Sequence, residues 1–287
     1  MDSITHTLFG LAIYGGVDKR EMSKPMKRAT LFTAVVGSHI PDIDVISQLW
    51  DTEGQYQMWH RGITHSLFMI PVWALLLIAV CYMIWGVKDR RLFYLGLLAV
   101  FIHNTSDIFN AWGTGYLEPF SSIRLTFGTI PIIDFVIWGI LLIGFLYKKF
   151  NKTATHQVYH IVGAVIVLHV ALQSFQGYVI YQQYEGVYEQ HTLSASFVPW
   201  NFSVIGKNDK EVEIIETNLF GRENVAYVLE SAPDTDLEKL FKKVPEAKTL
   251  YEWSPFVVIV DDDERIGVYD PRFYRNGQSF LFEYIEK

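Results

Sequence analysis

Long runs of apolar residues dominate the first 181 positions of the chain. Four of these runs, each bounded by charged or polar residues, approach or reach the roughly 20 residues that cross a bilayer as a helix. They cover residues 66–87, 92–108, 129–147 and 159–181. Two shorter runs, 4–17 and 29–40, precede them, and their alternative is a buried helical hairpin in a soluble core. We therefore expect a mainly α fold, a polytopic membrane bundle of about six helices.

The chain after residue 185 has a different pattern, in which short strand-like runs alternate with turn sequences. A helical spacing covers residues 234–244, and residues 261–264 and 276–277 are typical of hairpin connectors. The strand-like runs are 211–217, 226–230, 256–260, 266–269 and 279–285. These features predict a soluble α+β domain over 186–287, after a transmembrane helical domain over 1–185.

Charge is distributed unevenly along the chain. Of 24 Lys and Arg and 31 Asp and Glu, 11 basic and 20 acidic residues lie after Tyr181, so the acidity belongs to the soluble domain. This balance argues against a nucleic-acid surface there. The single cysteine, Cys81, lies inside an apolar run and excludes an intrachain disulfide. The first residues lack a basic n-region, so we expect the first helix to remain in the mature protein.

Basic residues also predict the orientation in a membrane. Eleven Lys and Arg lie in the loops after residues 17, 87 and 147, whereas the alternate loops hold only Arg61 and Arg124. Short loops rich in Lys and Arg stay in the cytoplasm. With six spans, the N-terminus, the loops 41–65 and 108–128, and the C-terminal domain are then extracytoplasmic.

Histidine and aspartate residues gather at the predicted outer ends of these helices. Imidazole and carboxylate groups are zinc ligands, and two metal ions suit the hydrolysis of phosphate esters. We therefore expect a divalent metal site, of zinc type, with one or two ions. The candidate ligands are His6, Asp42, Asp44, His60, His65, His103 and Asp107.

Each candidate also has a structural explanation. His103 and Asp107 have i, i+4 spacing and share a helix face, which suits either chelation or an interhelical hydrogen bond. Asp42 and Asp44 could cap a following helix. Arg61 offers a guanidinium fork for a phosphate, or it could be an interfacial arginine that extends toward water.

Other polar residues receive structural assignments. We expect His39 to support the site, His169 to be an interhelical hydrogen-bond partner, and Asp134 to pair with a ligand histidine or with Arg124. Two further histidines, His156 and His160, are placed at the opposite membrane face.

Four spaced motifs within about residues 1–125 resemble those of the bacterial and archaeal membrane-bound metal-dependent hydrolases, described as LexA-binding, inner membrane-associated hydrolases. The motifs are Met1-Asp2-x-x-Thr5-His6-x-x-x-Gly10, Ser38-His39-x-Pro41-Asp42-x-Asp44, His60-Arg61-Gly62-x-Thr64-His65-Ser66 and His103-x-x-x-Asp107-x-x-Asn110-x-Trp112-Gly113-Thr114. Their order is more distantly similar to the ligand order of zinc-dependent phospholipase C. That likeness implies metal binding by His6, Asp42 or Asp44, His65, His103 and Asp107, with Asp107 bridging two ions; ligands for a third ion are not found.

The expected function is hydrolysis of a lipid or lipid-linked phosphoester at the outer membrane face. The catalytic candidates are Asp42 and Asp44, of which an uncoordinated one acts as general base, and Arg61. One alternative is a non-catalytic metal-binding membrane protein that regulates or anchors a partner through its C-terminal domain. Another is an ion-coupled transporter, although the clustering of ligands at one face argues against an ion path.

Overall fold

The computed structural model describes residues 1–287 and divides into two compact units. The first unit combines Met1–Asp44 with Arg61–Ser174. The second combines Val45–His60 with Phe175–Lys287, so it contains most of the predicted soluble domain. A short segment from the N-terminal half of the chain therefore belongs to the same compact unit as the C-terminal residues.

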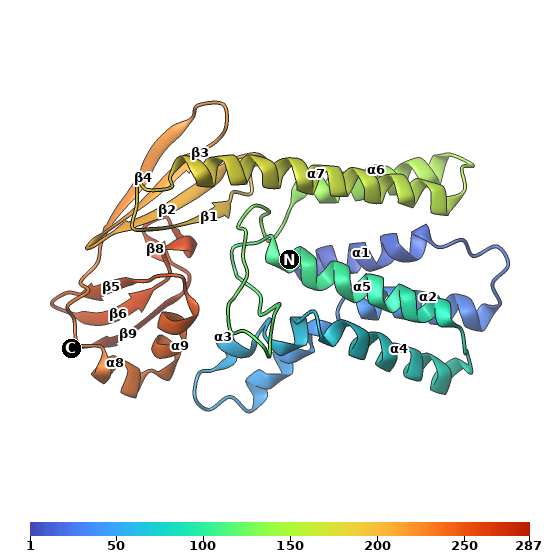
Figure 1. The fold of residues 1–287 in the computed structure, drawn as a ribbon, viewed down its shortest axis with the longest axis horizontal. Helices are drawn as coiled ribbons and strands as arrows, with labels where there is room; N and C mark the ends of the chain where they lie inside the picture. The colour runs from blue at the N-terminus through green and yellow to red at the C-terminus, as the bar shows by residue number, and fades with distance from the viewer. The chain divides into compact units, whose positions relative to one another are not determined.

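Six helices coincide with the six predicted apolar segments and run along a common direction in Figure 1. The last of them continues into the second unit. They are α1 (Ser3–Gly16), α2 (Lys24–Gly37), α4 (Met69–Trp85), α5 (Arg90–Ile108), α6 (Phe135–Phe150) and α7 (Thr155–Gln183).

The start of α6 differs from the prediction, because residues 129–134 lie outside the helix. The carboxylate of Asp134 accepts hydrogen bonds from the backbone N–H groups of Val136 and Ile137, which makes it the N-cap. The cap sets the first residue of the helix, however apolar the residues before it are. The apolar run therefore begins before its helix does.

One helix, α7, is long and apolar enough to cross a membrane, judged by length and composition. Only 22% of its most apolar 18-residue window is buried inside the protein. The 17 residues of α4 and the 16 of α6 rise about 25 Å and 24 Å, short of a hydrocarbon core of about 30 Å. Two bent helix pairs, α2 with the segment Ile40–Leu49 and residues 56–65 with α4, add candidates. The six-span bundle thus stays a prediction.

Small residues let α2, α4 and α5 pack closely. An added Cβ at Gly37 of α2 would lie 2.9 Å from the Ala99 Cβ of α5 and 3.3 Å from a methyl carbon of Leu77 in α4. The sulfur of Cys81 is buried, 3.4 Å from the hydroxyl oxygen of Thr33. Cys81 is therefore a core residue, as its apolar surroundings in the sequence indicate.

The C-terminal part of the second unit contains three antiparallel sheets and two short helices, so an α+β C-terminal part is confirmed. The first sheet has the order β1-β2-β3-β4 and the second β5-β6-β9; β7 and β8 form a small hairpin. The strands are β1 (Gln190–Ala195), β2 (Phe202–Asn208), β3 (Glu211–Thr217), β4 (Glu223–Glu230), β5 (Val258–Asp261), β6 (Arg265–Tyr269), β7 (Tyr274–Arg275), β8 (Gln278–Ser279) and β9 (Phe282–Glu286), and the helices are α8 (Glu238–Lys243) and α9 (Pro245–Trp253).

Three short elements connect α2 to α4. They are η1 (Ile40–Leu49), α3 (Tyr56–Trp59) and η2 (Ile63–His65). The part of this connection in the second unit rests on α9, where the side-chain amide of Gln55 donates to the Thr249 hydroxyl at 3.0 Å. Because a bilayer cannot separate polar segments in contact, residues 45–60 and α9 share one side of any membrane.

Candidate metal centre

Four predicted ligands meet in the first unit. Each of Asp42, His65, His103 and Asp107 offers a ligand atom within 4.8 Å of those of the other three. They come from η1, η2 and α5. The side chains of the last three are completely buried, whereas that of Asp42 is 27% exposed. The cluster is therefore enclosed by protein on most sides and reached by solvent at Asp42.

The ring orientation of His103 is fixed by the backbone. Its Nδ1 lies 2.7 Å from the carbonyl oxygen of Ser38, at the end of α2. A carbonyl oxygen can only accept, so Nδ1 carries the proton and donates. In the neutral ring, Nε2 then holds a lone pair, and this atom faces the cluster.

The ring of His65 is held in the same way by side chains. The Thr64 hydroxyl donates to the Asp44 carboxylate at 2.9 Å, so its oxygen can accept from His65 Nδ1, 3.0 Å away. A carboxylate oxygen of Asp44 is itself 3.4 Å from the same nitrogen. These contacts leave His65 Nε2 as the lone-pair nitrogen. Carboxylate support of this kind is common behind metal-bound histidines.

The two lone-pair nitrogens face each other. His65 Nε2 and His103 Nε2 are 3.1 Å apart, and a carboxylate oxygen of Asp42 is 3.2 Å from the first and 3.5 Å from the second. Two neutral rings in these tautomers cannot hydrogen-bond to each other, and the nearby carboxylate adds negative charge. A cation among the three groups, either a metal ion or a proton on one ring, would satisfy them all.

His6 adds a fifth candidate from α1. Its ring is completely buried and stacks on that of His103, with centroids 3.9 Å apart. Neither ring nitrogen has a hydrogen-bond partner. His6 Nε2 lies 3.4 Å from Asp107 Oδ1. A buried polar atom without a partner costs about 1–3 kcal/mol, so the donor set fits a divalent cation.

Arg61 is directed into the protein. It is 5% exposed and has a backbone φ of 57°, and its Nε is 3.3 Å from Asp107 Oδ2. One terminal nitrogen donates to the side-chain oxygen of Asn110 at 3.0 Å, and the other to the carbonyl of Met1 at 3.3 Å. The Met1 amino group also contacts Asp107. This geometry favours a role in holding Asp107 over the expected fork for a substrate phosphate.

Neither Asp44 nor His60 belongs to the four-residue group. Asp44 accepts from the backbone N–H of Arg61 at 2.9 Å as well as from Thr64, which places its carboxylate behind His65. His60 belongs to the second unit, where its ring stacks on that of Tyr56 with centroids 5.3 Å apart. Ligand roles for both stay predictions.

Residues outside the cluster have structural contacts. His169 Nε2 and Asp134 Oδ2 are 2.9 Å apart and buried, so the prediction of an interhelical partner for His169 is confirmed, and Asp134 bonds to it. His39 Nε2 is 2.9 Å from the Thr7 hydroxyl. His160 lies beside Gly16, at the opposite end of α1 from His6.

The connection between α5 and α6 lies against the ligand segment. The backbone N–H of Gly115 donates to the Arg61 carbonyl at 2.7 Å, and that of Leu67 donates to the Tyr116 carbonyl at 2.9 Å. Partial burial in this loop raises the pKa of Glu118, although Arg124 opposes the shift, and burial lowers the pKa of Arg124. These two charged groups lie in the part of the first unit that holds Arg61 in place.

Sequence reasoning missed three groups that shape the cluster. They are the Ser38 carbonyl, the Asn110 side chain and the Thr64 hydroxyl. Asn110 and Thr64 belong to the family motifs, so their position in those motifs could have indicated a role at the site. A backbone carbonyl gives no sequence signal at all.

The fold and the cluster define a helical membrane protein with a candidate metal centre. The chain belongs to the YdjM inner membrane protein family, whose model matches residues 1–181. It is therefore an integral protein of the inner membrane. The match includes every residue of the four-residue group and ends before β1.

A similar protein is the uncharacterized protein YfhP of Bacillus subtilis (strain 168), which is 36% identical over 139 residues. The alignment covers 47% of this chain and 42% of that protein, so the chain spans less than half the length of this relative. No solved structure matches the chain.

Proposed function

We propose that the chain is a metal-dependent hydrolase that acts on a lipid or lipid-linked phosphoester at the outer face of the membrane. The observation that carries this proposal is the pair of Nε2 atoms of His65 and His103, which lie 3.1 Å apart. The Nδ1 atom of each ring is already hydrogen-bonded to the protein. The buried Asp107 carboxylate and the His6 ring, whose nitrogens have no hydrogen-bond partner, complete a donor set suited to zinc.

His65, His103 and Asp107 would hold the ion, with His6 close enough to join them and Asp42 left uncoordinated beside it. A bound divalent ion would polarise a phosphoryl oxygen and supply hydroxide near neutral pH. The remaining work falls to the protein. The Ser38 carbonyl and Asp44 fix the two imidazole rings, and Arg61 fixes Asp107.

Asp42 is the best candidate for proton transfer. It is the one member of the four-residue group with a partly exposed side chain, at 27%, so a substrate can approach it. A carboxylate in that position can accept the proton of an attacking water and pass it to the leaving group. In this proposal Asp42 is the uncoordinated member of the 42/44 pair and acts as the general base.

The test compares two variants in protein purified in detergent. Asp107→Asn keeps the size of the side chain but removes its charge, so we expect it to lose bound metal and to abolish hydrolysis of a phospholipid panel. His156→Ala changes a histidine at the start of α7, with its ring beside His160, and should leave metal content and turnover nearly unchanged. Metal content is measured by elemental analysis and turnover by phosphate or lipid release.

Other outcomes would favour other functions. Stoichiometric metal without turnover on any ester would contradict the hydrolase and favour a metal-binding regulatory protein. Equal damage from His156→Ala and Asp107→Asn, in folded protein, would favour an ion path along the helices. Removal of metal with a chelator should stop turnover, and added Zn²⁺ should restore it.

A further inference from the structure

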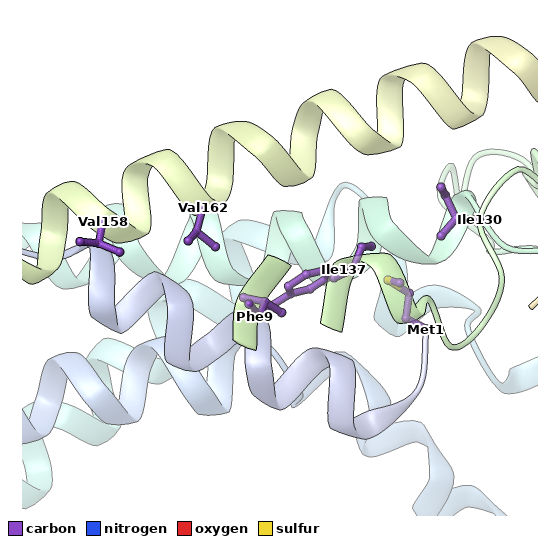
Figure 2. Close-up of a cluster of buried hydrophobic side chains, with 7 residues drawn as sticks. Met1, Phe9, Ile130, Ile137, Val158 and Val162 are labelled. Carbon is purple, nitrogen blue, oxygen red and sulfur yellow. The ribbon is translucent and has the colours of Figure 1, made fainter. Parts of the chain in front are cut away.

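An elongated apolar cavity lies in the first unit, between α1, α5 and α7, with Ile137 of α6 in its wall. Its volume is about 590 Å³, within the range of about 300–1,000 Å³ for ligand pockets. Figure 2 shows part of its lining: Val162 extends from α7 toward Phe9 of α1 and Ile137. The wall is almost entirely hydrocarbon, so the cavity suits an apolar ligand.

The cavity is long rather than round. Its lining runs from Leu95 to Ser106 on α5 and from Tyr159 to Ala171 on α7, a rise of about 17–18 Å along each helix. One leaflet contributes half of a hydrocarbon core of about 30 Å, or about 15 Å. The length therefore matches one extended hydrocarbon chain lying along the helices.

One end of the cavity is formed by neighbours of the metal cluster rather than by its candidate ligands. Met1 and Ser106 line that end; Ser106 precedes Asp107 in α5, and the Met1 amino group contacts the Asp107 carboxylate. In Figure 2, Met1 and Ile130 lie at this end of the row of side chains, and Val158 lies at the other. An amphipathic molecule with its tail in the cavity would have its polar group beside the cluster.

We propose that this cavity holds one acyl chain of a membrane lipid and thereby presents the lipid's ester to the metal centre. The proposal rests on the hydrolase function and names its substrate class, a lipid with at least one long chain.

Glycine positions allow the cavity to be filled without a clash. Gly163 of α7 lines it, and a Cβ added there meets no atom within 4 Å, so Gly163→Phe directs a ring into the empty space. Gly139 of α6 has equally open surroundings but lines a different pocket, next to Trp138 and Phe145. Gly139→Phe is the matched control.

The experiment uses the full chain in nanodiscs with phosphatidylglycerol that carries a diazirine midway along one acyl chain. After illumination, we expect labelling of Ile166, which lines the cavity, in the unaltered protein and in Gly139→Phe. Gly163→Phe should reduce it about tenfold or more, as expected for loss of at least 1.4 kcal/mol of binding. Labelling of Leu168, which is 57% exposed and faces away from the cavity, should not change.

The possible results separate this proposal from the hydrolase function. Equal labelling of Ile166 in Gly163→Phe and Gly139→Phe overturns the cavity assignment. Cavity-specific labelling with no ester hydrolysis leaves the chain-binding site standing and removes the hydrolase. Hydrolysis without cavity-specific labelling supports the hydrolase and overturns the chain-binding site. If Gly163→Phe fails to insert or fold, Val170→Trp fills the same cavity and is read in the same way.

Discussion

At the scale of single residues, the two aspartates at positions 42 and 44 have different surroundings despite their equivalence in sequence. Asp42 faces the Nε2 atoms of His65 and His103, whereas Asp44 lies on the Nδ1 side of His65. Groups that support a metal-bound histidine raise its basicity and fix its direction. The structure thus assigns the two carboxylates separable tasks that a substitution can distinguish.

We expect Asp44→Ala to weaken metal binding by about 10–100-fold, the usual loss when such a supporting group is removed. Titration against a chelator of known affinity measures the change. Asp18→Ala, which removes an exposed carboxylate paired with Arg20, serves as control and should have no effect. Unchanged metal affinity with lost turnover would instead give Asp44 the general-base role.

The gathering of His6, His65, His103 and Asp107 could be anticipated from sequence, because the charge of the loops predicts which helix ends share a face. The direction of Arg61 could not. It depends on a backbone φ of 57° and on Asn110, a partner 49 residues away. Local sequence patterns contain no information on such distant contacts.

At the scale of elements, the packing of the helices affects the geometry of the cluster. Gly37 closes α2 against α4 and α5, and the next residue, Ser38, provides the carbonyl that orients His103. A side chain at position 37 would push the helices apart and move that carbonyl. The packing of an apolar interface is therefore coupled to the direction of a candidate ligand.

Gly37→Ala should destabilise the protein by about 1–3 kcal/mol, as overpacking does, and should lower metal affinity as well. Gly139→Ala, whose Cβ meets nothing within 4 Å, should leave both unchanged or raise stability slightly, by less than about 1 kcal/mol of helix propensity. Thermal unfolding in detergent and metal titration check the pair. Retained affinity in a destabilised Gly37→Ala protein would refute the coupling.

Elements were predictable where composition and period agree. The run 211–217 alternates polar and apolar residues up to Ile214, where a register shift follows, and is β3. By contrast, β1 has the polar sequence QHTLSA and is specified by pairing with β2. Pro245 suggests an end to the helical pattern, yet it occupies the first turn of α9, where its missing N–H costs nothing.

At the scale of the whole molecule, two separate observations bear on topology. The basic loops favour an extracytoplasmic C-terminal domain. The hydrogen bond between Gln55 and Thr249 requires only that the 45–60 segment and α9 share a side. The basic loops predict the compartment of the C-terminal domain. The hydrogen bond concerns only whether the two segments lie on the same side, so either statement can be wrong while the other is right.

We expect a reporter inserted after Gly54 and one fused at Lys287 to lie on the same side of the membrane, the extracytoplasmic side. Alkaline phosphatase activity and the fluorescence of a protein that matures only in the cytoplasm measure the side of each reporter. A fusion after Lys88 should give the opposite result. Disagreement between the first two positions would refute the contact, whereas agreement on the cytoplasmic side would refute only the orientation.

The attachment of residues 45–60 to α9 also affects the order in which parts of the chain can fold during synthesis. Gln55 must wait for a partner 194 residues later in the chain, long after α2 and α5 have left the ribosome. Domains generally fold as units in the order of their synthesis. The covalent neighbours of this segment, Asp44 and Arg61, therefore belong to the last part of the helical region to become fixed, and a nascent chain that stops at residue 181 would carry the cluster residues with that segment still unanchored.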